Sequence, residues 1–172
     1  MNQFNKINFN LVPTLWLTMM LFFSSNEARS NSEFNNTPST EVETLGKLIN
    51  LPFHPTQVIW QVKEMTSNQP ESFGPKDWML FALLTFEETH FRKILEQSPE
   101  QLNPEQSVFW NAEYIFAWFP PTLKEKLVLE GEKYRWSIHT RTAKIFTKSP
   151  LLQGYFVPLG DHFQVFLFLY TM

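Results

Sequence analysis

The alternation of hydrophobic and polar residues predicts a β-strand over Thr56–Lys63. Successive side chains of a strand point to opposite faces, so one face of this segment is expected to be apolar and the other wetter. The apolar face is formed by Val58, Trp60 and Val62, and the wetter face by Gln57, Ile59, Gln61 and Lys63. This pattern is typical of a strand that is buried on one side.

Three further segments have the composition of strands. Residues Asp77–Phe86 follow Gly74-Pro75 and are almost uniformly apolar, which favours a strand buried on both faces. Near the C-terminus, Gly154–Leu159 and His162–Thr171 are rich in β-branched and aromatic residues. Gly160-Asp161 separates them and predicts a hairpin turn.

Between these two pairs of strands the sequence predicts helices. Acidic residues at its start favour a helix over Glu87–Gln97, and Asn103 followed by proline favours another over Pro104–Phe119. The second of these is apolar nearly all round, which is typical of a central helix. Thr122 is expected to begin a helix that stops at Gly131. Lys133–Lys148 has both helical and strand spacing, and we predict a helix there.

These elements predict an α+β fold. We expect a small sheet of about four mainly antiparallel strands, two N-terminal and two C-terminal, packed against three or four helices. A short helical stretch within Glu41–Asn50 precedes the first strand, and Pro52 prevents it from continuing. The single globular domain is expected to cover residues 51–172, after a polar linker over residues 31–50.

The N-terminus has the pattern of a secretory signal peptide over residues 1–30. Lys6 precedes thirteen uncharged residues, Leu11–Phe23, which as a helix would cover about 20 Å and so fall short of the roughly 30 Å hydrocarbon core. Ala28 and Ser30 are small residues suited to a cleavage site after Ser30. We therefore expect an exported protein, located in a periplasm. An uncleaved inner-membrane anchor and an ordinary core helix are the alternatives.

Composition narrows the classes of function. The formal net charge is −3, so the chain lacks the excess of basic residues that neutralises phosphates in nucleic-acid-binding proteins. The absence of cysteine excludes disulfides, thiol nucleophiles and cysteine-ligated metals. The chain carries 18 Phe, 6 Trp and 4 Tyr, an excess of aromatic residues that suits either a ring-filled core or a binding surface.

The candidate ligand or partner site is aromatic. Trp110, Tyr114, Trp118 and Phe119 lie toward the end of the helix predicted over Pro104–Phe119. Rings left exposed there would form an apolar patch that marks a binding site. The alternative is that the same rings fill the core.

Residues for catalysis or metal binding do not form a recognisable motif. Glu87 and His90 have the Glu-x-x-His spacing found in di-iron helix bundles, but those bundles need two such units and the sequence has one. The acidic residues are explained equally well as the start of a helix. The remaining histidines, His54, His139 and His162, have no metal-ligand spacing, and Asp161 next to His162 suits a turn. There is neither a Gly-x-Ser-x-Gly elbow nor a glycine-rich phosphate loop. We expect no cofactor and no metal.

The sequence therefore favours a small exported, non-enzymatic binding protein that takes an apolar or peptide-like ligand or another envelope protein as its partner. One alternative is a periplasmic hydrolase-like enzyme that uses Asp77, His139 or a glutamate. Another is a membrane-peripheral protein whose residues 108–119 lie in the bilayer interface.

Overall fold

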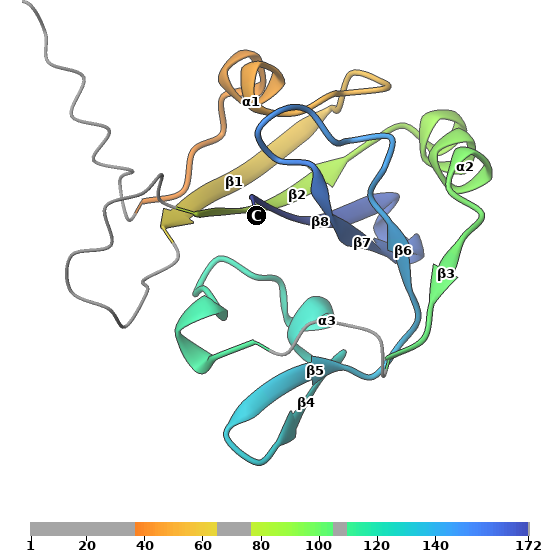
Figure 1. The fold of residues 1–172 in the computed structure, drawn as a ribbon. Helices are drawn as coiled ribbons and strands as arrows, with labels where there is room; N and C mark the ends of the chain where they lie inside the picture. The colour runs from red at the N-terminus through yellow and green to blue at the C-terminus, as the bar shows by residue number, and fades with distance from the viewer. Residues whose placement is uncertain (1–36, 65–76, 105–109, 172) are drawn as a thin grey trace, which may run out of the picture. The chain divides into compact units, whose positions relative to one another are not determined.

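The computed structural model describes residues 37–64, 77–104 and 110–171, which all lie within the unit Glu33–Met172 (Figure 1). The predicted signal peptide, 1–30, lies outside the described residues, as does part of the predicted linker. Among the described residues, no helix is both long and apolar enough to cross a bilayer.

The central element is a six-stranded antiparallel sheet. Its strand order is β1-β2-β8-β7-β6-β3, and a separate two-stranded sheet is formed by β4 and β5. The strands are β1 (Gln57–Glu64), β2 (Trp78–Thr85), β3 (Gln101–Leu102), β4 (Leu127–Glu130), β5 (Lys133–Trp136), β6 (Thr140–Thr142), β7 (Gln153–Leu159) and β8 (Gln164–Tyr170).

The four predicted strands are present as β1, β2, β7 and β8. Strand β2 lies between β1 and β8, which explains why nearly every residue of it is apolar: both of its faces are buried. The C-terminal hairpin forms as predicted, but its turn is longer than Gly160-Asp161. It contains the 3₁₀ helix η3 (Gly160–His162) and Phe163 in the left-handed conformation, with φ 52°.

One face of the sheet, the aliphatic face, is lined mainly by aliphatic side chains. The strands contribute Val58, Trp60, Val62, Leu80, Ala82, Leu84, Phe156, Val165, Leu167 and Leu169. Helices α1 (Val42–Leu48) and α2 (Glu88–Gln97) cover this face, together with residues 143–151 (Figure 1). Leu45 of α1 and Ile94 of α2 are fully buried against it.

The opposite, aromatic face is lined by rings and larger apolar groups. The strands contribute Ile59, Met79, Phe81, Leu83, Tyr155, Val157, Leu159, Phe166 and Phe168. Residues 110–138, which we call the lobe, cover this face (Figure 1). The lobe contains the 3₁₀ helix η2 (Ala112–Tyr114), the short helix α3 (Pro121–Lys124) and the β4–β5 hairpin.

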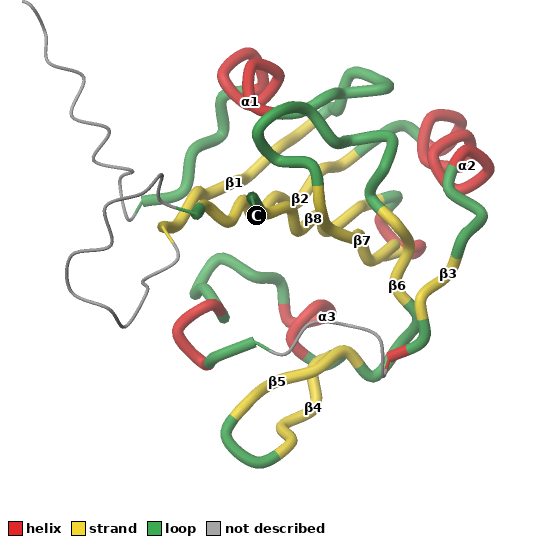
Figure 2. The backbone as a smooth tube through the Cα atoms, viewed as in Figure 1, coloured by secondary structure: helices red, strands yellow, loops and turns green. Residues whose placement is uncertain are grey.

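The predicted fold class is wrong. The protein is mostly sheet, with eight strands and only three short helices in the described residues, rather than a four-stranded sheet packed against three or four helices (Figure 2). Two predicted helices, Glu41–Asn50 and Glu87–Gln97, are present as α1 and α2. The other helical predictions fail in the segment that covers the aromatic face and continues into the sheet.

The helix predicted over Pro104–Phe119 is not observed where the segment is described. Residues 105–109 lie outside the described residues, Trp110 makes an isolated bridge to Tyr134, and only three residues form the 3₁₀ helix η2. The segment is apolar at nearly every position because it packs into the core on the aromatic face, not because it forms a central helix. Aromatic residues have modest helix propensity, so packing against the sheet decides the conformation.

The two following helices are also replaced by other structure. The segment that begins at Thr122 forms one helical turn, α3, and then the strand β4. Gly131, predicted as a helix stop, instead has φ +63° in the turn of the β4–β5 hairpin, where positive φ suits glycine. Lys133–Lys148 follows its strand spacing and contains β5 and β6.

Candidate functional site

The four predicted site residues all lie in the aromatic cluster between the sheet and the lobe. Trp110 and Phe119 are only 2% exposed, whereas Tyr114 and Trp118 are half-buried. Phe81 of β2 holds the cluster together. Its ring centroid lies 5.6 Å from that of Trp110, 6.1 Å from Tyr114, 5.0 Å from Phe116, 6.4 Å from Phe119 and 5.2 Å from Phe168. Of the four predicted residues, only Tyr114 and Trp118 are therefore accessible from outside the core.

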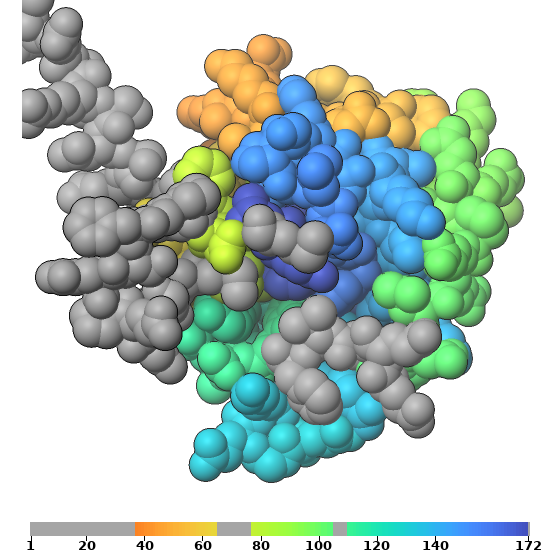
Figure 3. Space-filling model, viewed as in Figure 1, coloured from red at the N-terminus to blue at the C-terminus, as the bar shows by residue number. Residues whose placement is uncertain are grey.

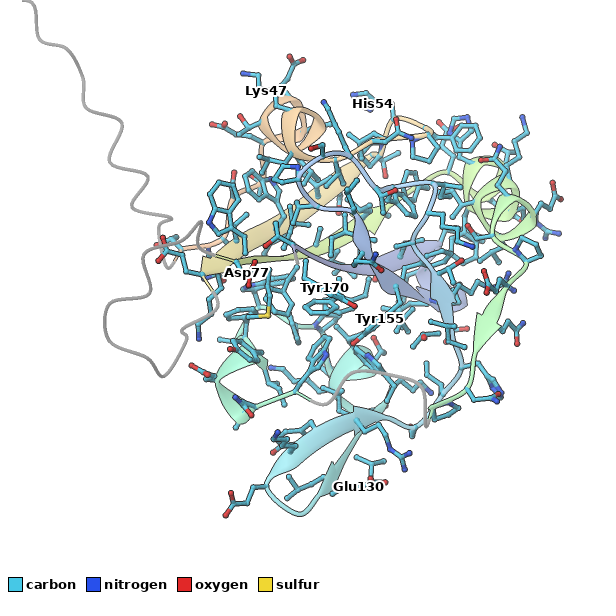
Figure 4. All side chains as sticks on the ribbon, in the orientation of Figure 1. Lys47, His54, Asp77, Glu130, Tyr155 and Tyr170 are labelled. Carbon is cyan, nitrogen blue, oxygen red and sulfur yellow. The ribbon has the colours of Figure 1, made fainter. Side chains whose placement is uncertain are left out.

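The buried part of this cluster contains a polar triad. The indole Nε1 groups of Trp110 and Trp136 both donate to the hydroxyl oxygen of Tyr155, at 2.6 and 3.0 Å. Burial raises the pKa of Tyr155 above its ordinary value, and the two donated bonds only partly oppose that effect. The phenol is thus held neutral in the core, and it satisfies two indoles that are shielded from water. Figure 4 shows Tyr155 beside Tyr170, between the sheet and the lobe.

The outer part of the cluster is a surface of three half-buried rings, Tyr114, Phe116 and Trp118, which we call the aromatic shelf. The rings of Phe116 and Trp118 are parallel within 4°, with centroids 5.8 Å apart. The indole Nε1 of Trp118 donates to Oε1 of Gln61 at 3.0 Å, and Gln61 is itself only 5% exposed. Since the polar atom of Trp118 is bonded to the sheet, the ring is fixed in orientation.

A charged pair borders the aromatic shelf. Lys63 Nζ lies 2.9 Å from Glu113 Oε2 and 4.7 Å from the ring centroid of Tyr114. The bond from Lys63 lowers the pKa of Glu113. Desolvation raises the pKa of Tyr114, and the neighbouring Glu113 charge adds to that rise. The ammonium therefore supplies a cation–π contact and a positive charge at the edge of an apolar surface.

Sequence reasoning missed four residues of this site: Gln61, Lys63, Phe116 and Tyr155. A signal for the first two was present, because both lie on the wetter face of the predicted strand Thr56–Lys63, which becomes the aromatic face of the sheet. No local signal pointed to Tyr155. Its partners are 45 and 19 residues away in sequence, so only the tertiary fold brings the three together.

The acids and histidines considered for catalysis lie apart and have structural surroundings. Asp77 Oδ1 accepts a bond from Thr171 Oγ1 at 3.1 Å, and that hydroxyl also accepts the backbone N–H of Trp78, so the group ties the start of β2 to the end of β8. His139 is exposed, and Figure 4 shows Asp77 and His54 at separate places on the molecule. No carboxylate–histidine hydrogen bond is present within the described ranges.

The metal-like spacing of Glu87 and His90 has a helical explanation. Glu87 precedes α2, and its carbonyl accepts the backbone N–H of His90 at 3.0 Å, while the His90 ring stacks on Phe53 with centroids 4.8 Å apart. Glu88 accepts a bond from Arg92 Nε at 3.0 Å, one turn later. In the part of the chain that the structure describes, no three acidic or histidine side chains are grouped as metal ligands.

Comparison of the chain with protein-family models, with curated proteins and with solved structures finds no match in any of the three. The function is therefore argued from the residues of the site.

Proposed function

We propose that this protein is an exported, non-enzymatic binding protein whose ligand is apolar or peptide-like and stacks on the aromatic shelf, Tyr114, Phe116 and Trp118. The observation that carries the proposal is the parallel Phe116–Trp118 pair, half-buried and fixed by the bond from Trp118 to Gln61. Rigid aromatic rings with their polar atoms already bonded offer apolar contact at little cost in conformational entropy.

The charged border refines the class of ligand. Lys63 stands at the edge of the shelf, where its ammonium is paired with the half-exposed Glu113. A ligand that combines a flat apolar group with a carboxylate or sulfonate would stack on the rings and take the place of Glu113 beside the ammonium. A peptide with an aromatic side chain near a carboxylate has this chemistry.

The membrane-peripheral alternative is not retained, because it required a helix over residues 108–119 that the described residues do not form. The hydrolase alternative is not retained either. It required Asp77 or a glutamate to lie within hydrogen-bond reach of a histidine such as His139, whereas Asp77 accepts a bond from Thr171 and the described residues contain no carboxylate–histidine hydrogen bond.

The shelf is tested with a probe of the expected chemistry, 1-anilinonaphthalene-8-sulfonate, titrated into the native protein. NMR should show saturable binding with the largest shift at the indole N–H of Trp118. The substitution Trp118→Leu should weaken the dye at least about tenfold, which corresponds to about 1.4 kcal/mol. The matched control is Leu152→Ser, which removes another exposed apolar side chain, 60% exposed, outside the shelf. Absence of saturable binding, or equal loss in the two variants, would contradict the proposal.

Export is tested on the full chain in a Gram-negative host. We expect a periplasmic protein whose mass corresponds to cleavage after Ser30. The substitution Leu17→Arg places a charge in the apolar run and should keep the chain in the cytoplasm. A protein that starts at Met1 and fractionates with the cytoplasm in its unsubstituted form would disprove export.

A further inference from the structure

Strand β4 has one edge without hydrogen-bond partners among the described residues. The backbone N–H and C=O of Tyr134 in β5 are bonded to Trp110, so they point away from β4. Leu129 lies opposite Tyr134 in the hairpin, and in such a pair both residues direct these groups outward. Leu127, two residues earlier, does the same. The outer edge of β4 therefore presents two N–H and two C=O groups.

The side chains of this strand are exposed and apolar. Val128 is 46% exposed and Leu129 is 56% exposed, and they are neighbours among the few large apolar residues at the described surface. Figure 3 shows the hairpin at the surface of the lobe. An exposed apolar edge strand is a template for pairing with another strand.

We propose that β4 pairs with β4 of a second copy of this chain, antiparallel about a two-fold axis at Val128. In this register Leu127 lies opposite Leu129 of the partner chain, and Leu129 opposite Leu127. The outward groups of both chains then form four backbone hydrogen bonds, and the two hairpins become one four-stranded sheet. The interface is isologous and closes at two chains.

Charge makes this edge complementary to itself. Lys126 and Glu130 flank the apolar residues at opposite ends of β4, so antiparallel pairing about Val128 places each lysine directly opposite the glutamate of the other chain. Opposite charges at such positions stabilise cross-strand pairs, whereas two lysines would repel each other. Within each chain, Glu130 also forms an ion pair with Arg135 of β5.

This proposal concerns residues outside the aromatic shelf, and it does not depend on a ligand. The charge pattern also favours a second copy of β4 over other strands as the pairing partner. A strand of unrelated sequence would gain only the backbone bonds, whereas a second β4 also supplies both flanking charges in the reversed order and the apolar centre.

The test is the association state of the protein as purified, measured by sedimentation equilibrium over a range of concentrations. We expect a monomer–dimer equilibrium. Lys126→Glu and Glu130→Lys each place like charges at both ends of the paired edge, so either substitution alone should raise the dimer dissociation constant about tenfold or more. Leu152→Ser, at an exposed site outside β4, should leave it unchanged.

Mixing the two charge variants is the decisive experiment. The acidic edge of Lys126→Glu is complementary to the basic edge of Glu130→Lys, so the mixture should form a heterodimer with an affinity near that of the unsubstituted protein. Circular dichroism of each variant confirms that it is folded. A protein that is monomeric at every concentration overturns the proposal, as does a dimer that both substitutions leave unchanged or a mixture that fails to associate.

Discussion

One face of the six-stranded sheet is lined by aliphatic side chains and covered by helices α1 and α2, whereas the other is lined by rings and covered by the largely irregular lobe. Aliphatic groups have no hydrogen-bonding atoms, so the first face closes by apolar burial alone over most of its area. Indoles and phenols carry polar atoms that need partners when buried.

That difference explains why directional side-chain hydrogen bonds hold the covering segment to the aromatic face of the sheet. On the aromatic face Trp110 and Trp136 share the hydroxyl of Tyr155, and Trp118 is bonded to Gln61. Each of these bonds joins the lobe to a strand of the sheet. The lobe has little regular secondary structure of its own, so these directional contacts and the rings around Phe81 fix its position. A surface held in this way is suited to binding.

The largest expected effect comes from removing the central ring of the aromatic face. Phe81→Ala deletes a fully buried ring that touches four lobe residues and should cost about 3–5 kcal/mol of unfolding free energy. Its matched control is Leu80→Ala, the adjacent residue on the aliphatic face, with an expected cost of about 2–5 kcal/mol. Urea denaturation measures both.

The two variants are separated by near-ultraviolet circular dichroism, which reports on fixed aromatic rings. Phe81→Ala should reduce the tryptophan signal and increase hydrogen exchange within residues 110–138, whereas Leu80→Ala should largely preserve both. Equal loss of the aromatic signal in the two variants would show that the faces do not behave as separate layers.

Removing the hydroxyl oxygen of Tyr155 is expected to have a smaller effect on the unfolding free energy. Tyr155→Phe keeps the ring but leaves the indole N–H groups of Trp110 and Trp136 without an acceptor, which should cost about 2–4 kcal/mol. Tyr170→Phe is the control, because no described residue bonds to that hydroxyl, and its cost should stay below about 1 kcal/mol. Comparable losses would argue that the triad contributes nothing beyond packing.

The contrast between the faces also explains what the sequence could predict. The strands β1, β2, β7 and β8 were predicted because alternation and continuous apolar runs are local signals that the sheet preserves. The lobe was not predicted, since a segment buried on several sides is apolar at nearly every position and carries no informative period. Rings in such a segment are positioned by contacts with residues distant in sequence.

The candidate site was predicted only in part for the same reason. Tyr114 and Trp118 lie at the surface of the aromatic cluster, whereas Trp110 and Phe119 are buried within it. The helix assumed for all four gave no basis for separating them. The bond that orients Trp118 joins it to Gln61, 57 residues away, a relation that no spacing rule contains.

Alkaline pH should weaken the aromatic face by a further, moderate amount. Burial raises the pKa of Tyr155 in the folded protein, while an unfolded tyrosine ionises near pH 10. Stability from this neutral phenol is therefore complete below pH 10 and decreases as the pH rises above it. Between pH 10 and 11 the loss should be about 1 kcal/mol. Tyr155→Phe should show a correspondingly shallower decrease in urea denaturation, and parallel curves for the two proteins would refute the assignment.

The smallest effect tests whether the lobe is docked at its edge. The bond from Lys63 lowers the pKa of Glu113, so the ion pair is intact above the ordinary carboxyl pKa and is lost as the pH falls through the lowered one. Glu113 is 51% exposed, and the effect on stability is correspondingly slight. NMR titration of its carboxyl carbon should give a midpoint below 4.5. Lys63→Met should raise that midpoint, whereas Lys63→Arg should keep it low. Lys63 belongs to the sheet and Glu113 to the lobe. If Lys63→Met left the Glu113 midpoint unchanged, the two side chains would not be in contact in solution.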